Sequence, residues 1–392
     1  MAGSDAGRPP LVYLDHSATT PLSPGVMAAM RPYLEAGGGN PSGSHAAGRR
    51  ARVAVETARS EVAGVLGCRS GEVVFTSGGT EADNLALRGM ARAALRQGRG
   101  RHVVVSAVEH EAVLHTASDL SAFGIETTIV GVDAEGRVDP DDVASAVRDD
   151  TILVSMMLAN NEVGTIEPVA DIGRLLRRRG VPLHTDAVQA PAWLDLDVEA
   201  LGVDLLSLSA HKFYGPKGVG LLYVREGTAI DPVQTGGGQE HGLRSGTENV
   251  AGIVGLAHAL RLAADQGPAA VPRVRELRDA LAAALESAGG VHMTGSRTHR
   301  LPGHLSVCVE GVRADTILLG LDMAGICASS GSACATGRLT PSHVLTAMGV
   351  PGDLAQGALR LTLGYATTAA EVEFTTDTLK ALVRRARESV AP

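Results

Sequence analysis

The chain has 392 residues, of which 44% are hydrophobic and 20% are charged, and its formal net charge at pH 7 is −8. This length suffices for two domains that each bury a core, and the composition is that of an ordinary globular protein. The acidic balance argues against a nucleic-acid-binding protein, which usually carries a basic surface.

The cysteines and histidines show no pattern of a structural metal site. The four cysteines, Cys68, Cys308, Cys327 and Cys334, include no C-x-x-C pair, and the 13 histidines include no H-E-x-x-H spacing. The first ten residues lack an apolar stretch behind a basic start, and no run of 18 apolar residues occurs. We therefore expect no metal, no signal peptide and no membrane span, and we expect a cytoplasmic protein.

Strand and helix patterns alternate through the first two-thirds of the chain. Apolar segments predict strands at residues 73–76, 102–106, 151–157, 181–185, 205–209 and 220–224. Their apolar residues are consecutive rather than alternating, which is typical of strands buried on both faces of a sheet. Between them, one helical pattern ends at Gly67 and another begins at Pro168. This order predicts an α/β fold with a mostly parallel sheet covered by helices.

The last third of the chain has a different pattern. After a glycine-rich stretch at 235–246, a long helical pattern covers about 249–288. Further helical patterns follow, mixed with short strand patterns at 304–309, 325–329 and 358–363. We interpret this part as a smaller α+β domain that begins near Gly267.

Polar residues follow five of the predicted strands, at the point where each strand ends. They are Ser77-Gly78-Gly79-Thr80-Glu81, Glu109-His110, Asn160-Asn161-Glu162, Asp186 with Gln189, and His211-Lys212. Each group alone is explained by a turn or a helix cap. Ligands of open parallel sheets bind at the carboxyl ends of the strands. Together, these residues would place a phosphate seat, a carboxylate, an imidazole and a lysine on one rim.

Pyridoxal phosphate requires this set of groups. It needs a lysine for covalent attachment, a carboxylate facing its ring nitrogen, and helix N-terminal amides for its phosphate. The chain has only three lysines, Lys212, Lys217 and Lys380. Lys217 is the alternative to Lys212, but Pro216-Lys217-Gly218 predicts a turn rather than a strand end.

The sequence resembles the cysteine desulfurases of the NifS/IscS type, from about Leu11 to the C-terminal helix. The matching motifs, in order and at similar spacing, are at 14–21 (LDHSATTP), 39–41 (GNP), 75–81, 109–110, 160–164 (NNEVG), 184–189 (HTDAVQ), 209–218, 244–247 (RSGT) and 329–334. Three positions depart from the family: His241 replaces a common arginine, Gly79 a frequent alanine, and His16 a usual tyrosine or asparagine.

The resemblance implies a fold-type-I pyridoxal-phosphate enzyme and a homodimer with active sites at the subunit interface. It implies a large domain at 21–266 with a seven-stranded sheet, and a small domain made of 1–20 and 267–392. By the matching positions, Lys212 would hold the cofactor, Asp186 would pair with the ring nitrogen, and His110 would stack on the ring. The remaining cofactor contacts would be Gln189 to the phenolic oxygen, and Gly79, Thr80, Ser209, His211 and Thr247 of the partner subunit to the phosphate.

The resemblance also implies where L-cysteine and its sulfur would bind. Asn160 and Arg360, with Asn40, would hold the substrate carboxylate. Cys334 would be the nucleophile that carries the persulfide, and it lies in a loop of small residues at 329–337. Cys308 and Cys327 lie in apolar segments and are expected to be buried and inert, and Cys68 is expected to be structural.

The implied activity is that of a cysteine desulfurase, which converts L-cysteine to L-alanine and passes the sulfur to an acceptor protein. The acceptor could be an iron–sulfur scaffold, a tRNA-thiolation enzyme or another sulfur carrier, and the sequence does not choose among them. The alternatives are a selenocysteine lyase, another class V aminotransferase-like enzyme, or a non-catalytic sulfur-transfer scaffold.

Overall fold

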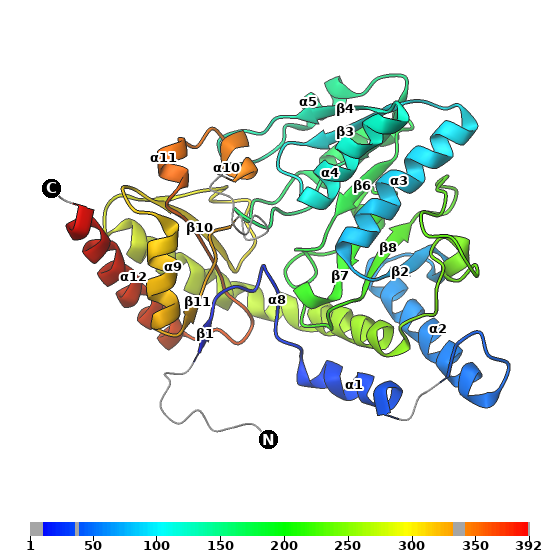
Figure 1. Ribbon diagram of the computed structural model, residues 1–392, viewed down its shortest axis with the longest axis horizontal. Coiled ribbons are helices and arrows are strands. Elements are labelled where there is room, and N and C mark those ends of the chain that lie inside the picture. Colours follow the sequence, from blue (N-terminus) through cyan, green and yellow to red (C-terminus); the bar gives the residue numbers. More distant parts are fainter. Residues whose placement is uncertain (1–10, 36–38, 332–341, 391–392) are drawn as a thin grey trace.

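The chain folds into a large and a small lobe that share one long helix, α8 (Val250–Glu286) (Figure 1). A computed structural model describes residues 11–35, 39–331 and 342–390, with the side chains described up to residue 388. In Figure 1 the large lobe lies on the right, the small lobe lies on the left, and α8 runs from one to the other. None of the helices in the described ranges combines the length and apolar character needed to cross a bilayer.

A seven-stranded sheet in the order β2-β8-β7-β6-β5-β3-β4 forms the centre of the large lobe. Neighbouring strands from β7 to β4 are parallel, and β8 is antiparallel to both β2 and β7. The prediction of an α/β fold with a mostly parallel sheet is confirmed. The strands are β2 (Val73–Thr76), β3 (His102–Ser106), β4 (Glu126–Val130), β5 (Thr151–Ser155), β6 (Leu183–Asp186), β7 (Leu205–Ser209) and β8 (Gly220–Val224).

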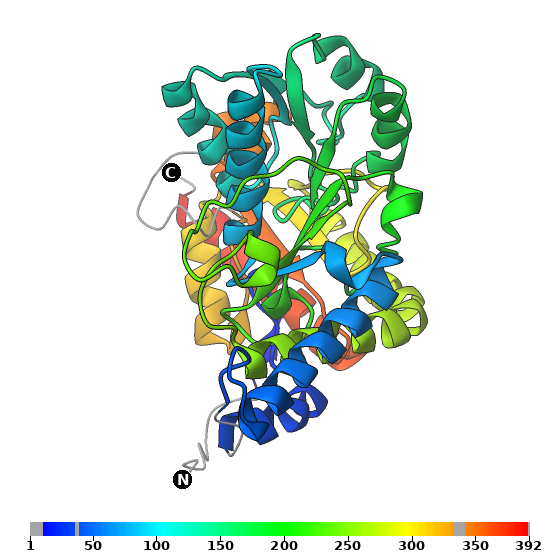
Figure 2. The same cartoon turned by 90° about the vertical axis from the view of Figure 1, so that its right-hand side faces the viewer.

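Successive apolar side chains of the central strands alternate between two cores, one on each face of the sheet. On β3, for example, Val104 contributes to one core, and Val103 and Val105 contribute to the other. Helices cover both faces (Figure 2). One face packs on α3 (Gly79–Gln97) and α4 (Glu111–Asp119). The other packs on α1 (Pro24–Glu35), α2 (Ala46–Leu66), α5 (Pro140–Ala146), α6 (Val169–Arg177), α7 (Val198–Leu201) and the first half of α8.

The small lobe has its own core around an antiparallel sheet in the order β12-β10-β9. Near the beginning of the chain, β1 pairs in parallel with β11 on this lobe. Its strands are β1 (Val12–Tyr13), β9 (Val291–Met293), β10 (His304–Val309), β11 (Ile326–Cys327) and β12 (Ala358–Thr362). Its helices are α9 (Ala314–Met323), α10 (His343–Ala347), α11 (Gly352–Ala355) and α12 (Ala369–Val390).

The predicted domain boundary at residue 267 falls inside α8, which continues through it. Residues of α8 up to Ala263 belong to a core of the large lobe, and those from Val274 onward belong to the core of the small lobe. One unbroken helix thus packs in both lobes, and the division into 21–266 and 1–20 with 267–392 stays a prediction.

A buried ion pair ties the glycine-rich stretch at 235–246 to the edge of the large sheet. Arg59 of α2 donates from both terminal nitrogens to the two carboxylate oxygens of Glu240, at 2.8 and 2.9 Å. Glu240 also accepts from the Phe75 backbone N–H at 2.8 Å, and the Arg59 guanidinium lies 4.8 Å from the centre of the Phe75 ring. Both charged side chains are almost fully buried. The pair therefore fixes this stretch on β2.

We predict that Glu240→Ala lowers the free energy of unfolding by about 3–5 kcal/mol, because Arg59 would remain buried without its partner. The matched control is Glu56→Ala, which removes an exposed carboxylate 3.4 Å from the same guanidinium and should cost less than about 1 kcal/mol. Urea unfolding of both variants measures the difference. Equal effects of the two substitutions would contradict the assignment.

Candidate active site

A cavity of about 370 Å³ opens at the carboxyl ends of the large-sheet strands, within the roughly 300–1,000 Å³ range of small-molecule sites. Its lining comes from the large lobe, from Arg360 and Gly331 of the small-lobe region, and from Ser17 and Ala18 near the beginning of the chain. The structure brings together most of the residues singled out from the sequence. They are Gly79, Thr80, His110, Asp186, Gln189, Ser209, His211, Lys212 and Arg360.

The N-terminus of α3 forms one wall of this cavity. The helix begins at Gly79, and its N-cap residue, Gly78, has no side chain to cap the first backbone N–H groups. Such amides, with the helix dipole, suit a phosphate. A Cβ atom on Gly79 would lie 2.8 Å from a methyl carbon of Val188. Glycine in place of the family's frequent alanine therefore keeps room that an alanine would take unless Val188 moved.

Lys212 is the lysine of the cavity. It follows β7, and its Nζ donates to the backbone carbonyl oxygens of Ser17 and, at 3.0 Å, of Ala18. All three lysines fall within the described residues. Lys217 is exposed, and Lys380 lies on α12, and neither lines the cavity. The geometry therefore favours Lys212 over Lys217 as an amine that reacts with a bound ligand.

Asp186 ends β6 and places a buried carboxyl group beside this lysine. Its Oδ1 accepts from the Val188 backbone N–H at 2.9 Å. Burial raises the pKa of Asp186, and the charges of His110 and Lys212 oppose that rise. One side-chain atom each of Asp83, His110 and Asp186 lies within 4.8 Å of the others, a spacing that a metal could also use. The adjacent lysine would repel a metal cation and instead suits a ligand with an anionic or carbonyl group.

The two histidines of the cavity have fixed orientations. His110 caps α4, and its Nδ1 accepts from the Ala112 backbone N–H at 3.1 Å. The neutral ring therefore carries its proton on Nε2. His211 lies 3.1 Å from the Thr19 hydroxyl through Nδ1. Burial and the charges of Lys212 and Lys217 lower the pKa of His211 to about 4, so it is neutral near pH 7.

Arg360 reaches the cavity from β12 of the small lobe. It is 3% exposed, and its terminal nitrogens donate at 2.9 Å to Asp15 Oδ1 and to the Asn161 carbonyl oxygen. Its Nε is buried and has no hydrogen-bond partner among the described residues. The guanidinium is thus held in place at the wall of the cavity, where its charge suits an incoming carboxylate.

Comparison with known proteins decides the family. The model of the class V aminotransferases matches residues 12–374. The chain belongs to this family.

Within the family, its relatives include cysteine desulfurases. It is 47% identical to a cysteine desulfurase IscS of Dictyoglomus turgidum, over 96% of this chain and 95% of the relative. It is 46% identical to that of Anaeromyxobacter dehalogenans, over 96% and 93%. A solved NifS-like protein shares 38% identity with a TM-score of 0.90, covering 96% of this chain and all of the other. A structure described as SspA in complex with cysteine shares 35% identity with a TM-score of 0.79, covering 90% and 98%. These findings confirm the resemblance and the fold type that it implied.

Asn160 does not contact the cavity, and its neighbour Asn161 does. The Asn160 amide is fully buried, where it donates to the Val108 carbonyl oxygen at 2.9 Å and accepts from the N–H groups of Glu162 and Val163. The Asn160 side chain is thus engaged in hydrogen bonds within its own turn. The expectation that Asn160 holds a substrate is therefore corrected in favour of Asn161.

Two other predicted residues, Asn40 and Thr247, do not line the cavity. Asn40 is exposed, and its side chain accepts from the Ser42 backbone N–H at 2.9 Å, so the structure does not bring it to the cavity. Thr247 is exposed and does not line the cavity of its own chain. Cys334 lies outside the described residues.

Two of the positions that depart from the family, His241 and His16, have different surroundings in the structure. His241 is exposed and has a left-handed backbone with φ of 57°. His16 bonds the Thr362 carbonyl oxygen at 2.9 Å through Nδ1, next to Lys212 in a small adjoining pocket. His241 therefore lies on the surface of this chain, whereas His16 supports the wall of the site.

Asp83 lines the cavity but was missed by the reasoning from sequence. It lies four residues after Gly79 on α3, which places both on the same face of the helix. That spacing was the available signal, and the strand-end reasoning did not extend into the helix.

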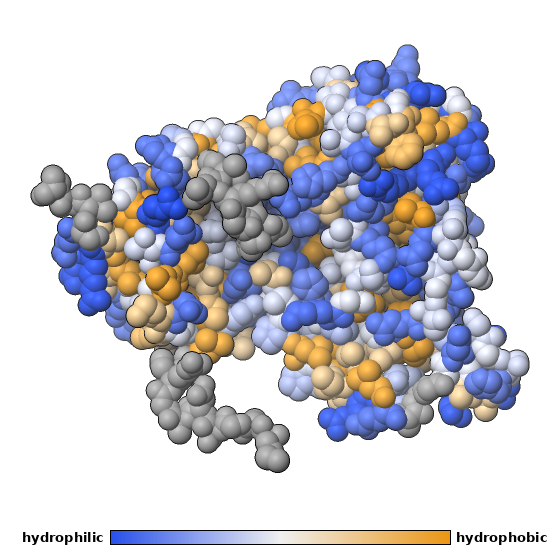
Figure 3. Space-filling model, viewed as in Figure 1, coloured by the Kyte–Doolittle hydropathy of each residue, from blue (hydrophilic) through white to orange (hydrophobic). Residues whose placement is uncertain are grey.

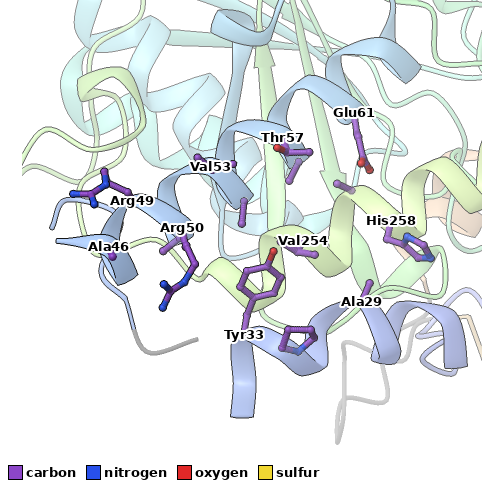
Figure 4. Close-up of a pocket in the computed structure, with 15 residues that line it drawn as sticks. Ala29, Tyr33, Ala46, Arg49, Arg50, Val53, Thr57, Glu61, Val254 and His258 are labelled. Atoms are coloured by element: carbon purple, nitrogen blue, oxygen red, sulfur yellow. The ribbon is translucent and has the colours of Figure 1, made fainter. Parts of the chain in front are cut away.

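A second hollow, of about 1,060 Å³, lies between α1, α2 and α8 and is a different kind of surface. Figure 4 shows Tyr33, Arg50 and Val254 facing it from these three helices. Most of its lining is alanine and other apolar or short side chains. Apolar side chains also gather over the α1 and α8 region in Figure 3. It lacks the lysine–carboxylate pair of the first cavity, which remains the candidate active site.

We predict that alanine substitutions of the two neighbouring asparagines have different effects, one on stability and the other on binding. Asn160→Ala should lower the free energy of unfolding by about 1–3 kcal/mol, because three buried backbone groups lose their partner. Asn161→Ala should change stability by less than about 0.5 kcal/mol but weaken binding in the cavity. Denaturant unfolding and titration with pyridoxal phosphate measure the two effects. The reverse pattern would return Asn160 to the site.

Proposed function

We propose that this chain is a pyridoxal-phosphate-dependent cysteine desulfurase that converts L-cysteine to L-alanine and takes the sulfur onto Cys334. The observation that carries the proposal is that Lys212, Asp186 and His110 share one cavity under the N-terminus of α3. The names of the relatives, cysteine desulfurase IscS, agree with this chemistry.

The residues present fit the cofactor. The uncapped N-terminus of α3, with Thr80, Ser209 and His211, would hold the phosphate, and Thr247 of the partner subunit would complete it. Lys212 would bind the aldehyde carbon. Asp186 would pair with the ring nitrogen, and Gln189 would form a hydrogen bond to the phenolic oxygen. When bound, pyridoxal phosphate supplies an aldehyde that reacts with amines and a ring that accepts electrons.

The remaining residues act on the substrate. Arg360 binds the carboxylate of L-cysteine through charge-assisted hydrogen bonds, with Asn161 beside it. The Lys212 amine accepts the proton of the substrate Cα and returns a proton to the product. His110, with its proton on Nε2, relays the proton of a thiol. The asparagine and the arginine thus orient the substrate toward the lysine.

Sulfur transfer requires a reactive thiol, and three of the four cysteines are poorly suited to it. Burial raises the pKa of Cys308 to about 11 and that of Cys68 to about 12. Burial also raises the pKa of Cys327. A thiol with a raised pKa stays protonated near neutral pH and is a weak nucleophile. This elimination supports Cys334.

Ser329, which precedes Cys334 by five positions in the sequence, lies next to Arg360, the arginine proposed to bind the substrate. Ser329 and Arg360 exchange backbone hydrogen bonds at 2.7 and 3.1 Å, and Gly331 lines the cavity. Cys334 follows Gly331 by three positions in the sequence, which supports the proposal that its thiol serves this cavity. The substrate C–S bond would break as a sulfur–sulfur bond forms. L-cysteine and the enzyme thiol would give L-alanine and a persulfide, which balances without an oxidant.

We also propose a cytoplasmic homodimer that delivers the persulfide sulfur to an acceptor protein. The exposed position of Thr247, away from its own cavity, supports a role in a second subunit's site. The acceptor is a sulfur carrier such as an iron–sulfur scaffold or a tRNA-thiolation enzyme.

We predict that Cys334→Ser lowers alanine formation from L-cysteine at least about 100-fold, because the nucleophile is lost. The visible absorbance of bound pyridoxal phosphate should stay unchanged. Cys327→Ser is the matched control and should keep the rate within about twofold, because burial already disfavours its thiolate.

Quantified alanine, enzyme persulfide and keto acid report the outcome. Unaltered turnover of Cys334→Ser would exclude Cys334 as the sulfur acceptor. A keto acid as the main product of the unmodified protein would indicate transamination instead.

A further inference from the structure

Asp83 lies beside Asp186 at the wall of the cavity, and the proposed chemistry leaves it without a role. It is on the second turn of α3, it is 1% exposed, and its Oδ1 has no hydrogen-bond partner among the described residues. Atoms of Asp83, His110 and Asp186 lie within 4.8 Å of one another. Two carboxyl groups thus lie side by side, away from water.

Two buried carboxylates at this separation do not both ionise near neutral pH. Each loses its hydration on burial, and each negative charge disfavours the other. The two groups therefore titrate as a pair, and the pair keeps one proton over a wide range of pH. The surroundings of the two groups decide which of them carries it.

The surroundings of Asp186 favour its charged form. Burial raises the pKa of Asp186, but the Val188 backbone N–H, which donates to Oδ1 at 2.9 Å, and the charge of Lys212 oppose that rise. Backbone donors and nearby cations both stabilise a carboxylate. Asp186 is therefore the member of the pair that ionises.

The surroundings of Asp83 favour its neutral form. Burial and then the charge of Asp186 raise its pKa well above the ordinary value, against one hydrogen bond to the Ser207 hydroxyl. His184 Nε2 lies 3.6 Å away, but burial lowers the pKa of His184 to about 3, so this ring is uncharged.

The groups that hydrogen-bond to His184, the ring next to Asp83, are also uncharged. His184 bonds the hydroxyls of Ser155 at 2.8 Å and Ser207 at 3.0 Å. Glu109 also lies near Asp83, and burial raises the pKa of Glu109 to about 8, so this group is mostly uncharged near pH 7. The titratable groups around Asp83 are His184 and Asp186 of β6 and Glu109 and His110 after β3.

We propose that Asp83 is a positioning residue that holds the proton of this pair, so that Asp186 alone presents a negative charge to the ring nitrogen of the cofactor. Asp83 acts through Asp186 and not on the substrate. The inference rests on the proposed function, because the ring nitrogen is that of pyridoxal phosphate. It predicts that an uncharged side chain of the same shape can replace Asp83.

The test compares the cofactor-loaded unmodified protein with Asp83→Asn near neutral pH. Infrared difference spectra should show that the substitution removes the band of one protonated carboxyl group and no carboxylate band. The pH dependence of the visible absorbance of the bound cofactor should coincide for the two proteins within about half a pH unit. Glu167→Gln is the matched control, because Glu167 is a buried acid whose pKa burial raises to about 8 and that does not line the cavity. It should remove its own acid band and leave the cofactor absorbance unchanged.

Two results would overturn the inference. One is loss of a carboxylate band in Asp83→Asn. The other is a shift of more than about half a pH unit in the absorbance titration, because removal of a negative charge near the cofactor would move it.

Ser207→Ala provides a second test if Asp83→Asn does not fold. Removing the hydroxyl that bonds Asp83 should shift the acid band, and an unmoved band would mean that Asp83 does not carry the proton. Failure of the proposed function would look different, because the unmodified protein would then show no absorbance from bound pyridoxal phosphate. Failure of the inference alone would leave that absorbance in place.

Discussion

The site depends on one electrostatic contact, the approach of a buried carboxyl group on β6 to the lysine that follows β7. Burial disfavours the charge of Asp186, and the nearby charge of Lys212 opposes that effect. Adjacent parallel strands end at the same edge of a sheet, and this edge brings Asp186 and Lys212 into one cavity with the N-terminus of α3. The sheet thereby places positive groups, Lys212 and the N-terminus of α3, and a carboxyl group, Asp186, in one small cavity.

The small lobe adds a second constraint, because the arginine that we propose to bind the substrate belongs to a different sheet. Arg360 lies on β12, and its guanidinium is held by Asp15, near the beginning of the chain, and by the turn at Asn161. The backbone of Arg360 also pairs with that of Ser329, which precedes Cys334 by five positions in the sequence. The proposed binding of a substrate carboxylate, the position of the chain's first segment and the backbone at Ser329 are therefore linked through one residue.

Sequence reasoning predicted the central sheet well because buried parallel strands leave a simple pattern of consecutive apolar residues. It missed β4, because this edge strand has Glu126 and two threonines and is largely exposed. It chose Asn160 over Asn161, because the choice depends on which amide the turn uses for its own hydrogen bonds. It overlooked Asp83, whose role depends on a neighbour, Asp186, that lies 103 positions later in the chain. Motifs identified the types of group, and only the packing showed which atoms face one another.

The central claim is that Lys212 alone is placed to react with the aldehyde of pyridoxal phosphate. Borohydride reduction of the cofactor-loaded protein, followed by peptide mass mapping, tests it directly, because reduction makes the attachment permanent. The account predicts that the pyridoxyl group is found on Lys212, with Lys217 and Lys380 unmodified. Labelling of Lys217 or Lys380 in place of Lys212, or the absence of a covalent label, would contradict it.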